Sequence, residues 1–451
     1  MTFSPRPGAG PSRDYRFPAV ERATLSNGVT LAVARQPRLP LVTLLALVDA
    51  GATSDAAGLE GAASLTARAL TEGTRRIEGG ALALEVERLG SGLDASADWD
   101  DALVHLSVTP ERLPRAFALL GEVLTEPAFR ARDVDRLREE RLADLLQQQV
   151  EPRSLADDKF SFHLFAPGSR YGQPADGNSD SVATLDASRV RAAYAARYAP
   201  TTTTIVAVGD VTLARARELA EATIGNWRAP AAPAVALDDS TRPEGRRVCV
   251  ITKSDAPQSE LRVGHAGVPR LHPDYFPIVV MNALLGGLFS SRINLNLRER
   301  NAFTYGARSA FEWRRGAGPF VVSTAVKTDV TAAATREILA EIERMREDTV
   351  AQDELELATA YLDGVFPIRY ETTQSVAQAI AIAKTFGLPD DYFTKYRAAV
   401  RAVSAEDVRR AARTYLHPER LLVIAVGDAE AIRGPLEALD IGPVHVETST
   451  T

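Results

Sequence analysis

RYAPTTTTIVAVGDV (Arg197–Val211) and TYLHPERLLVIAVGDA (Thr414–Ala429) share one pattern, in which a tyrosine and a proline precede an apolar strand that ends in Gly-Asp. In both copies the proline precedes the glycine by nine residues. The distance from Gly209 to Gly427 is 218 residues, which is far longer than the period of a solenoid repeat. The repeat therefore predicts that the chain contains two copies of a whole domain.

The segments around the two copies support this prediction. Each copy follows a helix-like segment, DASRVRAAYAARY or SAEDVRRAARTY, and the first residues of these segments, Asp186 and Ser404, are favourable N-caps. Each half opens with apolar strands, which are GVTLAVARQ and LVTLLALVDAG in the first half and RRVCVITK and SELRVGHAG in the second. The first half also holds a long helical pattern over residues 132–149.

A stretch rich in proline and alanine, RAPAAPAVALDDSTRPEG (Arg228–Gly245), lies between the copies and is typical of a linker. We therefore expect an α+β chain with an N-terminal half over residues 15–227, a linker over 228–245 and a C-terminal half over 246–443.

Composition excludes several classes of protein. The 451 residues are 45% hydrophobic and 25% charged, with a net charge of −7, so we expect a folded protein without general affinity for nucleic acid. No run of about 18 apolar residues and no signal-peptide core is present, so we expect no membrane insertion, and the choice between bacterial cytoplasm and periplasm stays open. The single cysteine, Cys249, lies in an apolar run and is expected to be a buried residue rather than a nucleophile.

The usual catalytic motifs are absent from the sequence. None of the six histidines forms H-x-x-x-H, H-E-x-x-H or H-x-x-E-H, the spacings that place two imidazoles one helical turn apart to hold zinc. No G-x-S-x-G elbow, P-loop or dinucleotide-binding glycine motif is present either. A metal site built by this chain alone is therefore not expected.

One dense cluster stands out in the second half, NLRERNAFTYGARS (Asn296–Ser309). The pattern predicts that a helix ends at Arg298 and that a strand starts at Tyr305, because the apolar period changes to two after Asn301. Without further context, Arg298 is a solvated charge and Tyr305 is one member of an aromatic strand face.

The run GGLFSSRINLNLRERNAFTYGARS resembles the GG-x-x-SR-L…LRE-x-x-G-x-x-Y segment of the pitrilysin, insulinase and processing-peptidase family. The resemblance extends from about residue 17 to 442 and includes the Gly-Asp strand ends and the duplicated layout. It implies two homologous halves, each a mainly antiparallel sheet packed with helices, arranged as half of a metallopeptidase clamshell.

The chain departs from the family at the zinc motif. Where catalytic members read approximately GLAHFLEHM, this chain reads GLEGAASLT, so Gly61, Ser64 and Leu65 replace the first histidine, the glutamate and the second histidine. The third ligand falls near Asp144. The resemblance therefore implies a chain that holds no zinc, is inactive alone and works with a homologous partner subunit that carries zinc and H-x-x-E-H.

In two-subunit members of the family, one chain supplies zinc and the other supplies an arginine and a tyrosine seven residues apart. Arg298 and Tyr305 match these positions, so the resemblance implies that they act in trans as donors to the oxyanion at the partner's zinc. The substrates of the family are unfolded peptides that add as a strand to a sheet edge. A strand expected over residues 90–108 resembles the sheet edge that catalytic members use for this, and its residues Leu93, Asp94, Ala95, Ser96 and Ala97 would contact the peptide. The alternative is that this stretch is a plain internal strand.

Two functions remain open at this point. The first is a non-catalytic, Arg/Tyr-bearing subunit of a heteromeric zinc peptidase. The second is a structural or peptide-binding relative with no role in hydrolysis, which would have no chemical need for Arg298 and Tyr305. A presequence-binding role is disfavoured, because RERNAFTYG contains a single glycine where those members carry a longer glycine-rich loop.

Overall fold

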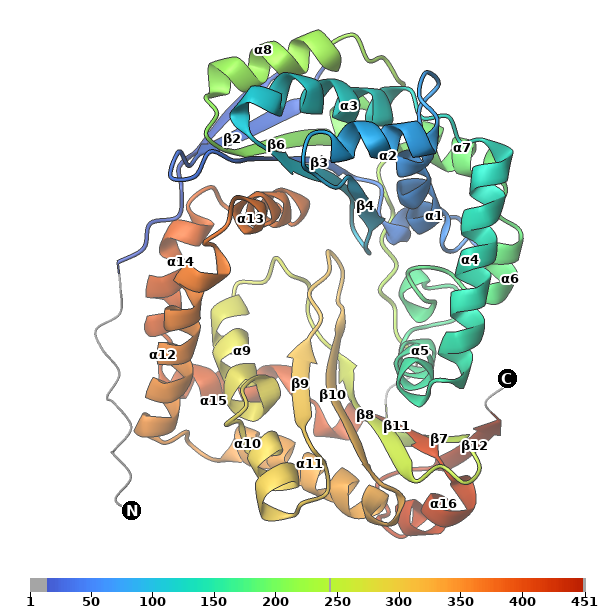
Figure 1. Ribbon diagram of the computed structural model, residues 1–451. Helices are drawn as coiled ribbons and strands as arrows, with labels where there is room; N and C mark the ends of the chain where they lie inside the picture. Colours follow the sequence, from blue (N-terminus) through green and yellow to red (C-terminus); the bar gives the residue numbers. More distant parts are fainter. Residues whose placement is uncertain (1–13, 243–244, 449–451) are drawn as a thin grey trace, which may run out of the picture.

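The computed structural model describes residues 14–242 and 245–448, so residues 1–13, 449–451 and residues 243–244 of the expected linker lie outside the described part. Two six-stranded mixed sheets, one from each half, lie at opposite ends of the molecule (Figure 1). The first has the order β1 (Val20–Thr24), β2 (Thr30–Arg35), β6 (Thr203–Gly209), β3 (Val42–Val48), β5 (Ala102–Val108) and β4 (Asp94–Ala97). The second has the order β12 (Val444–Thr448), β7 (Arg247–Thr252), β11 (Leu422–Gly427), β8 (Gln258–Ala266), β10 (Pro319–Lys327) and β9 (Ala307–Phe311).

The repeat found in the sequence supplies the equivalent strand of each sheet. β6 and β11 occupy the third position, and each pairs in parallel with one neighbour and antiparallel with the other. The helices before them begin at the predicted N-caps, since Asp186 accepts from the N–H groups of Ser188 and Arg189, and Ser404 accepts from that of Asp407. The expected α+β class with two similar halves is confirmed.

The two sheets differ at one edge. In the first, β1 precedes β2 in the chain and pairs with it antiparallel, whereas in the second β12 comes from the end of the chain and pairs with β7 in parallel. β12 lies past residue 443, where the sequence placed the end of the second half, because its few residues show no clear apolar period.

Helices cover both faces of each sheet. The N-terminal half contains α1 (Ala62–Ala69), α2 (Gly79–Glu87), α3 (Leu113–Thr125), α4 (Ala131–Val150), α5 (Pro152–Leu164), α6 (Ser179–Ala183), α7 (Ala187–Arg197) and α8 (Leu213–Thr223). The C-terminal half contains α9 (Tyr275–Asn282), α10 (Arg292–Asn294), α11 (Thr331–Glu347), α12 (Gln352–Arg369), α13 (Thr373–Thr385), α14 (Tyr392–Arg401), α15 (Ala405–Tyr415) and α16 (Ala429–Glu437). Two π-helical turns, η6 (Ala283–Gly287) and η7 (Leu295–Arg300), adjoin α9 and α10.

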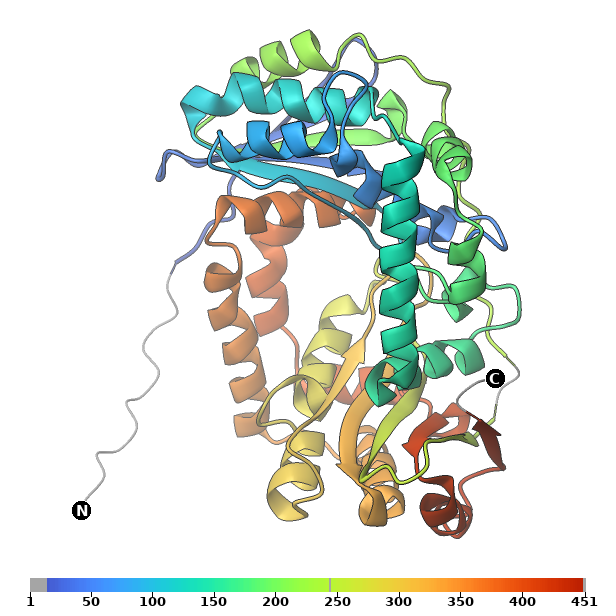
Figure 2. The ribbon, with the colours of Figure 1, turned by 45° about the vertical axis from the view of Figure 1, so that its right-hand side comes forward.

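Each half places one helix against the sheet of the other half. α5 belongs to the first half but packs its apolar side chains, such as Phe160, on β7, β8 and β11 of the second sheet. α13 belongs to the second half but packs Val376 and Ile380 on β3 and β6 of the first sheet. Figure 2 shows this helix directly beneath the first sheet. This double coverage accounts for strands such as β3, VTLLALV, in which every residue is buried.

The contact between α13 and the first sheet can be tested with two isoleucines on the same helix. Ile380 is buried against the first sheet, whereas Ile382 is exposed. We expect Ile380→Val to lower the free energy of unfolding by about 0.5–1.5 kcal/mol, because a buried methyl is lost, and Ile382→Val to leave it nearly unchanged. Urea unfolding followed by circular dichroism measures both, and equal effects would contradict the packing of α13 described above.

One helical run is long and apolar enough to cross a membrane by length and composition alone. It covers Tyr275–Arg300, and half of its apolar window is buried inside the protein. Its side chains Met281, Leu285, Ile293 and Leu297 belong to the core of the second half. A core helix passes the same test, so this feature is weak evidence for a membrane span.

Candidate functional site

Arg298 lies in the π-helical turn η7, which ends two residues later than the sequence predicted. Its side chain is 35% exposed, and its only ion pair among the described residues is with the neighbouring Glu299, at 3.5 Å. The guanidinium carbon lies 4.5 Å from the centre of the exposed Phe289 ring, in a cation–π contact. The ring thus holds the guanidinium close to the surface, where its donors remain accessible.

The prediction that Tyr305 starts a strand is wrong, because β9 begins at Ala307. The backbone of Gly306 is bonded to side chains instead of a strand: its N–H donates to Thr304 Oγ1 at 3.1 Å, and its carbonyl accepts from Thr324 Oγ1 at 3.0 Å. The alternation of buried residues therefore holds only from Ala307 onward. Tyr305 is 93% exposed, and its hydroxyl has no hydrogen-bond partner within residues 14–242 and 245–448.

One of the two predicted residues, Tyr305, lines a cavity of about 500 Å³. Arg298 does not line it, but its guanidinium lies over the ring of Phe289, which does. The remaining wall comes from the strands β8, β10 and β9, from the loop at Gly286–Leu288 and from Arg153 on α5. The cavity is thus built by both halves of the chain.

The outer edge of β9 is closed by asparagine side chains. Asn294 Oδ1 accepts from the N–H of Ala307 at 3.0 Å, and Asn282 Nδ2 donates to the carbonyl of Ser309 at 3.1 Å. Such side-chain bonds occupy backbone groups that would otherwise be free to pair with another strand. β9 is therefore closed to an added peptide strand at these positions.

The equivalent edge in the first half, at β4, is open. The stretch of residues 90–108, expected as one strand, is a hairpin of β4 and β5, because Asp98 donates its N–H to the carbonyl of Asp101 and turns the chain. β4 forms the sheet edge, and the backbone of residues 94–97 has hydrogen-bond partners only in β5 among the residues that the structure describes. The predicted peptide contacts, Leu93 to Ala97, thus lie at an accessible strand edge beside α1.

The four positions that correspond to zinc ligands and the catalytic glutamate cannot hold zinc. Gly61 has no side chain and is the N-cap of α1, with φ of 93°. Leu65 is buried in the core of the first half, Ser64 is half-buried, and Asp144 on α4 is exposed. The residues that replace the two histidines lack ligand atoms, so these positions do not fit the family's metal.

An ion pair that the sequence did not reveal holds the start of α1. The carboxylate of Asp55 accepts from the N–H groups of Gly61 and Ala63, at 2.9 and 2.8 Å, and from Arg170 Nη2 at 3.2 Å. Arg170 also donates to the carbonyls of residues 173–175. Burial raises the pKa of Asp55 to about 6, although Arg170 and the two N–H groups oppose the shift. No local pattern links these residues, which lie 115 positions apart.

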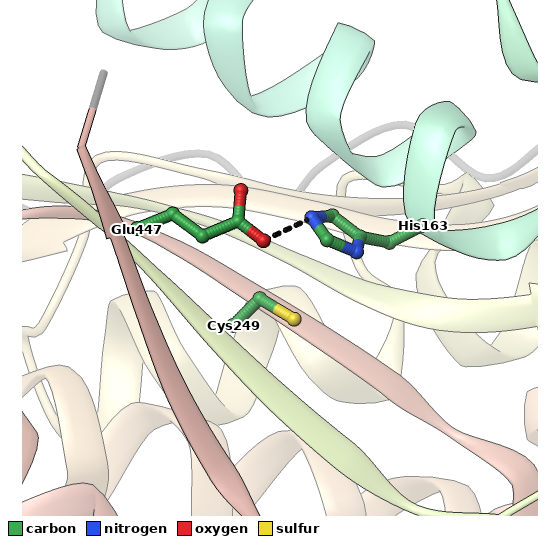
Figure 3. A group of neighbouring side chains, drawn as sticks. All are labelled: His163, Cys249 and Glu447. Atoms are coloured by element: carbon green, nitrogen blue, oxygen red, sulfur yellow. Dashed lines mark ion pairs between the residues drawn. The ribbon is translucent and has the colours of Figure 1, made fainter. Parts of the chain in front are cut away.

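A second polar cluster contains His163 of α5, Cys249 of β7 and Glu447 of β12 (Figure 3). Their ligand-type atoms lie within 4.8 Å of one another. His163 Nε2 and Glu447 Oε1 form an ion pair at 3.0 Å, and Lys159 Nζ lies 3.5 Å from the same carboxylate. Burial raises the pKa of the Cys249 thiol to about 11, which disfavours the thiolate needed to bind a metal. The cluster is thus accounted for as an interface between α5 and the second sheet.

Comparison with known proteins places this geometry in a family. Residues 30–166 match the family described as insulinase (peptidase family M16), and residues 184–362 match the peptidase M16 inactive domain. An uncharacterized zinc protease of Streptomyces coelicolor is 24% identical over 93% of both chains. A mitochondrial-processing peptidase subunit beta of Lentinula edodes is 24% identical over 92% of this chain and 91% of its own. Among solved structures, a peptidase M16 inactive domain from Pseudomonas fluorescens has a TM-score of 0.85 at 23% identity and covers 91% of this chain and 98% of its own.

Proposed function

This chain belongs to the insulinase family, peptidase family M16, and we propose that within it the chain is the non-catalytic subunit of a heteromeric zinc metallopeptidase that processes or degrades peptides. In this proposal a homologous partner carries zinc and the H-x-x-E-H motif. This chain supplies Arg298 and Tyr305 to the site on the partner.

The observation that supports the proposal is the exposure of Tyr305 in the cavity wall, with Arg298 stacked on the neighbouring wall residue Phe289. A tyrosine that serves only the fold is normally buried with a hydrogen-bonded hydroxyl, yet Tyr305 is 93% exposed. Within the described residues, the ion pair and the cation–π contact of Arg298 are with two exposed residues, Glu299 and Phe289. Neither side chain therefore makes a polar or ring contact in this part of the chain that holds a buried group in place.

The chemistry of these two side chains fits the role of donor. Cleavage of a peptide bond by a metal-activated water places negative charge on the carbonyl oxygen. A phenol hydroxyl and a guanidinium both donate hydrogen bonds, and the guanidinium keeps its charge at any physiological pH. Donors aimed at the developing oxyanion lower the barrier, so Arg298 and Tyr305 would act on the reacting peptide without holding metal.

A heteromeric assembly is supported by the relatives. The Lentinula edodes protein is named as subunit beta of a processing peptidase, which is a statement about that protein. For the present chain, a heteromeric assembly is also supported by the zinc positions that do not fit the metal and by the open edge of β4. A chain that can bind a peptide strand but cannot activate water needs a catalytic partner.

The proposal is tested by adding the purified chain to a zinc-bearing homologue and measuring the initial rate of peptide cleavage. We expect the chain to increase this rate, and Arg298→Ala or Tyr305→Phe to reduce the increase by about 10²- to 10³-fold, the usual cost of one oxyanion donor. Arg300→Ala and Tyr361→Phe are matched controls, because both residues are exposed, neither lines the cavity, and Arg300 has no cation–π contact with Phe289 like that of Arg298. We expect both controls to retain the full increase.

Three other results of this experiment would contradict the donor role or the proposed function. If both donor variants stimulate the homologue as well as the unmodified chain does, the donor role is wrong. If the unmodified chain gives no increase, the alternative function applies, in which the protein is a structural or peptide-binding member of the family without a role in hydrolysis. If the isolated chain bound zinc and cleaved a peptide, both the proposed function and the alternative function would be wrong.

A further inference from the structure

The cavity beside Tyr305 has a row of charged side chains that the donor role does not use. Ser323 of β10 pairs with Arg262 of β8 on one side and with Arg308 of β9 on the other. Side chains of directly paired residues project from the same face of a sheet. Arg262, Ser323 and Arg308 thus form a row across the sheet, and all three line the cavity.

Arg262 is already neutralised by carboxylates. Its side chain is 2% exposed, and its Nε and Nη1 atoms bind Asp157 Oδ1 at 2.5 Å and Glu260 Oε2 at 2.9 Å. These contacts also use the one carboxylate in the cavity wall, that of Glu260. The carboxylates of Asp157 and Glu260 are therefore already paired with Arg262 before any ligand arrives.

The other two arginines in the wall form no such ion pair. Arg308 on β9 and Arg153 at the start of α5 are exposed, and within the described part of the chain neither side chain forms an ion pair or a hydrogen bond, although the charge of Arg153 acts on the nearby carboxylate of Glu151. They reach the cavity from opposite halves of the protein. Arg262 already faces two carboxylates, so Arg308 supplies the positive charge in the wall that no ion pair within the described residues offsets.

A second cavity shows that this charge is a local property. It has a volume of about 310 Å³, and Asp98, Asp100 and Asp101 lie in its wall together with Trp99 and Trp313. The two cavities thus carry charges of opposite sign. A peptide with an acidic residue would be attracted to the cavity beside Tyr305 and repelled from the other.

We infer that the cavity beside Tyr305 is a subsite for a carboxylate of the bound peptide and that Arg308 is the residue that binds it. The inference rests on the proposed function, because it takes a peptide as the ligand. A guanidinium pairs with a carboxylate through two parallel hydrogen bonds, which lysine or a neutral side chain does not provide. Ser323 lies between Arg262 and Arg308 in the row and offers a further hydroxyl donor.

The position of Tyr305 sets where this carboxylate would lie along the peptide. Arg308 follows Tyr305 by three residues, so their Cα atoms are at most about 10 Å apart. If Tyr305 contacts the cleaved bond, the carboxylate belongs to a residue within about three positions of that bond. It comes either from an acidic side chain or from the peptide's own C-terminus.

Binding of three fluorescent peptides to the intact chain tests the inference. All share one unstructured sequence: the first has a central glutamate and an amidated C-terminus, the second has glutamine and a free C-terminus, and the third has glutamine and an amidated C-terminus. We expect the first or the second to bind about tenfold more tightly than the third in fluorescence anisotropy, in line with one charge-assisted hydrogen-bonded pair. Which of the two binds more tightly identifies the source of the carboxylate.

Variants connect this preference to Arg308. We expect Arg308→Gln to remove the tenfold difference and Arg308→Glu to favour a matched lysine peptide, whereas Arg336→Gln on α11, an exposed arginine outside the cavity wall, leaves the preference unchanged. Equal affinities for the three peptides, or no binding of any, overturn the subsite. Equal affinities with intact stimulation of the zinc-bearing homologue overturn the subsite alone, and a preference without stimulation overturns only the proposed function.

Discussion

Replacing Gly61 by histidine, which restores the residue that catalytic relatives carry there, is expected to destabilise the protein by more than about 3 kcal/mol. Two separate costs add at this position. Gly61 has φ of 93°, where a residue with a Cβ is strained by about 1–3 kcal/mol. A Cβ would also lie 2.7 Å from the carbonyl oxygen of Asp176, which is backbone and cannot rotate away.

A neighbouring glycine separates these two costs. Gly58 also has positive φ, of 80°, but a Cβ there would meet nothing within 4 Å. We expect Gly58→Ala to show the conformational cost alone and Gly61→Ala to show that cost plus the clash, as measured by urea unfolding. Equal losses in the two variants would show that the contact with Asp176 relaxes freely.

The same contact limits any attempt to rebuild the zinc motif. We expect the triple variant with Gly61→His, Ser64→Glu and Leu65→His to bind no stoichiometric zinc, because the third change also buries an imidazole in an apolar core. Elemental analysis of the purified variant measures this. Stoichiometric zinc in a folded variant would contradict the expectation.

Replacing Asp55 by alanine has the second-largest expected effect. The carboxylate is 2% exposed and pairs with Arg170, so its removal leaves a nearly buried guanidinium without its counter-charge. It also leaves the N–H groups of Gly61 and Ala63 without their acceptor. Loss of one member of a buried pair costs about 3–5 kcal/mol, and we expect a fall of that size in the free energy of unfolding. Asp133→Ala at the start of α4 is a control without a buried partner, and we expect it to cost less than about 1 kcal/mol.

Asp55 also predicts a dependence of stability on pH. Its pKa is about 6 in the folded chain against 3.8 for the free side chain, so between these values the folded state binds more protons than the unfolded state. Its contribution to stability is therefore complete below pH 3.8 and is lost as the pH rises through about 6, by up to about 3 kcal/mol. We expect Asp55→Asn to remove this part of the slope between pH 4 and 7. An unchanged slope would show that the carboxylate titrates normally.

The structure agrees with the sequence where a local pattern carries the information. The strand and glycine at the end of each repeat form equivalent strands, β6 and β11, because apolar runs bounded by a cap and a turn depend on near neighbours. The helix over residues 132–149 appears as α4 for the same reason. The apolar period wrongly predicted that a strand starts at Tyr305. There the backbone of Gly306 forms hydrogen bonds with the side chains of Thr304 and Thr324 in place of strand pairing.

The sequence did not indicate that α5 and α13 each pack on the sheet of the other half. An apolar helix face indicates that something covers it, but does not indicate which sheet does so. The answer depends on where the chain places each helix relative to two sheets of similar composition. Because α5 and α13 each pack on the sheet of the other half, the two halves are in contact and the cavity at Tyr305 has walls from both.

By itself, the sequence determined the duplicated α+β layout and the loss of ligand atoms at positions 61 and 65, because both follow from residue identity and spacing. Only the tertiary structure decided that Gly61 has no room for a side chain, since the obstacle is the backbone of Asp176, more than a hundred residues away in the chain. It also decided that Tyr305 lines one cavity with Arg308 and Arg153, and that Arg298 lies against Phe289 of its wall. Contacts between distant segments depend on how whole elements pack, which local patterns do not encode.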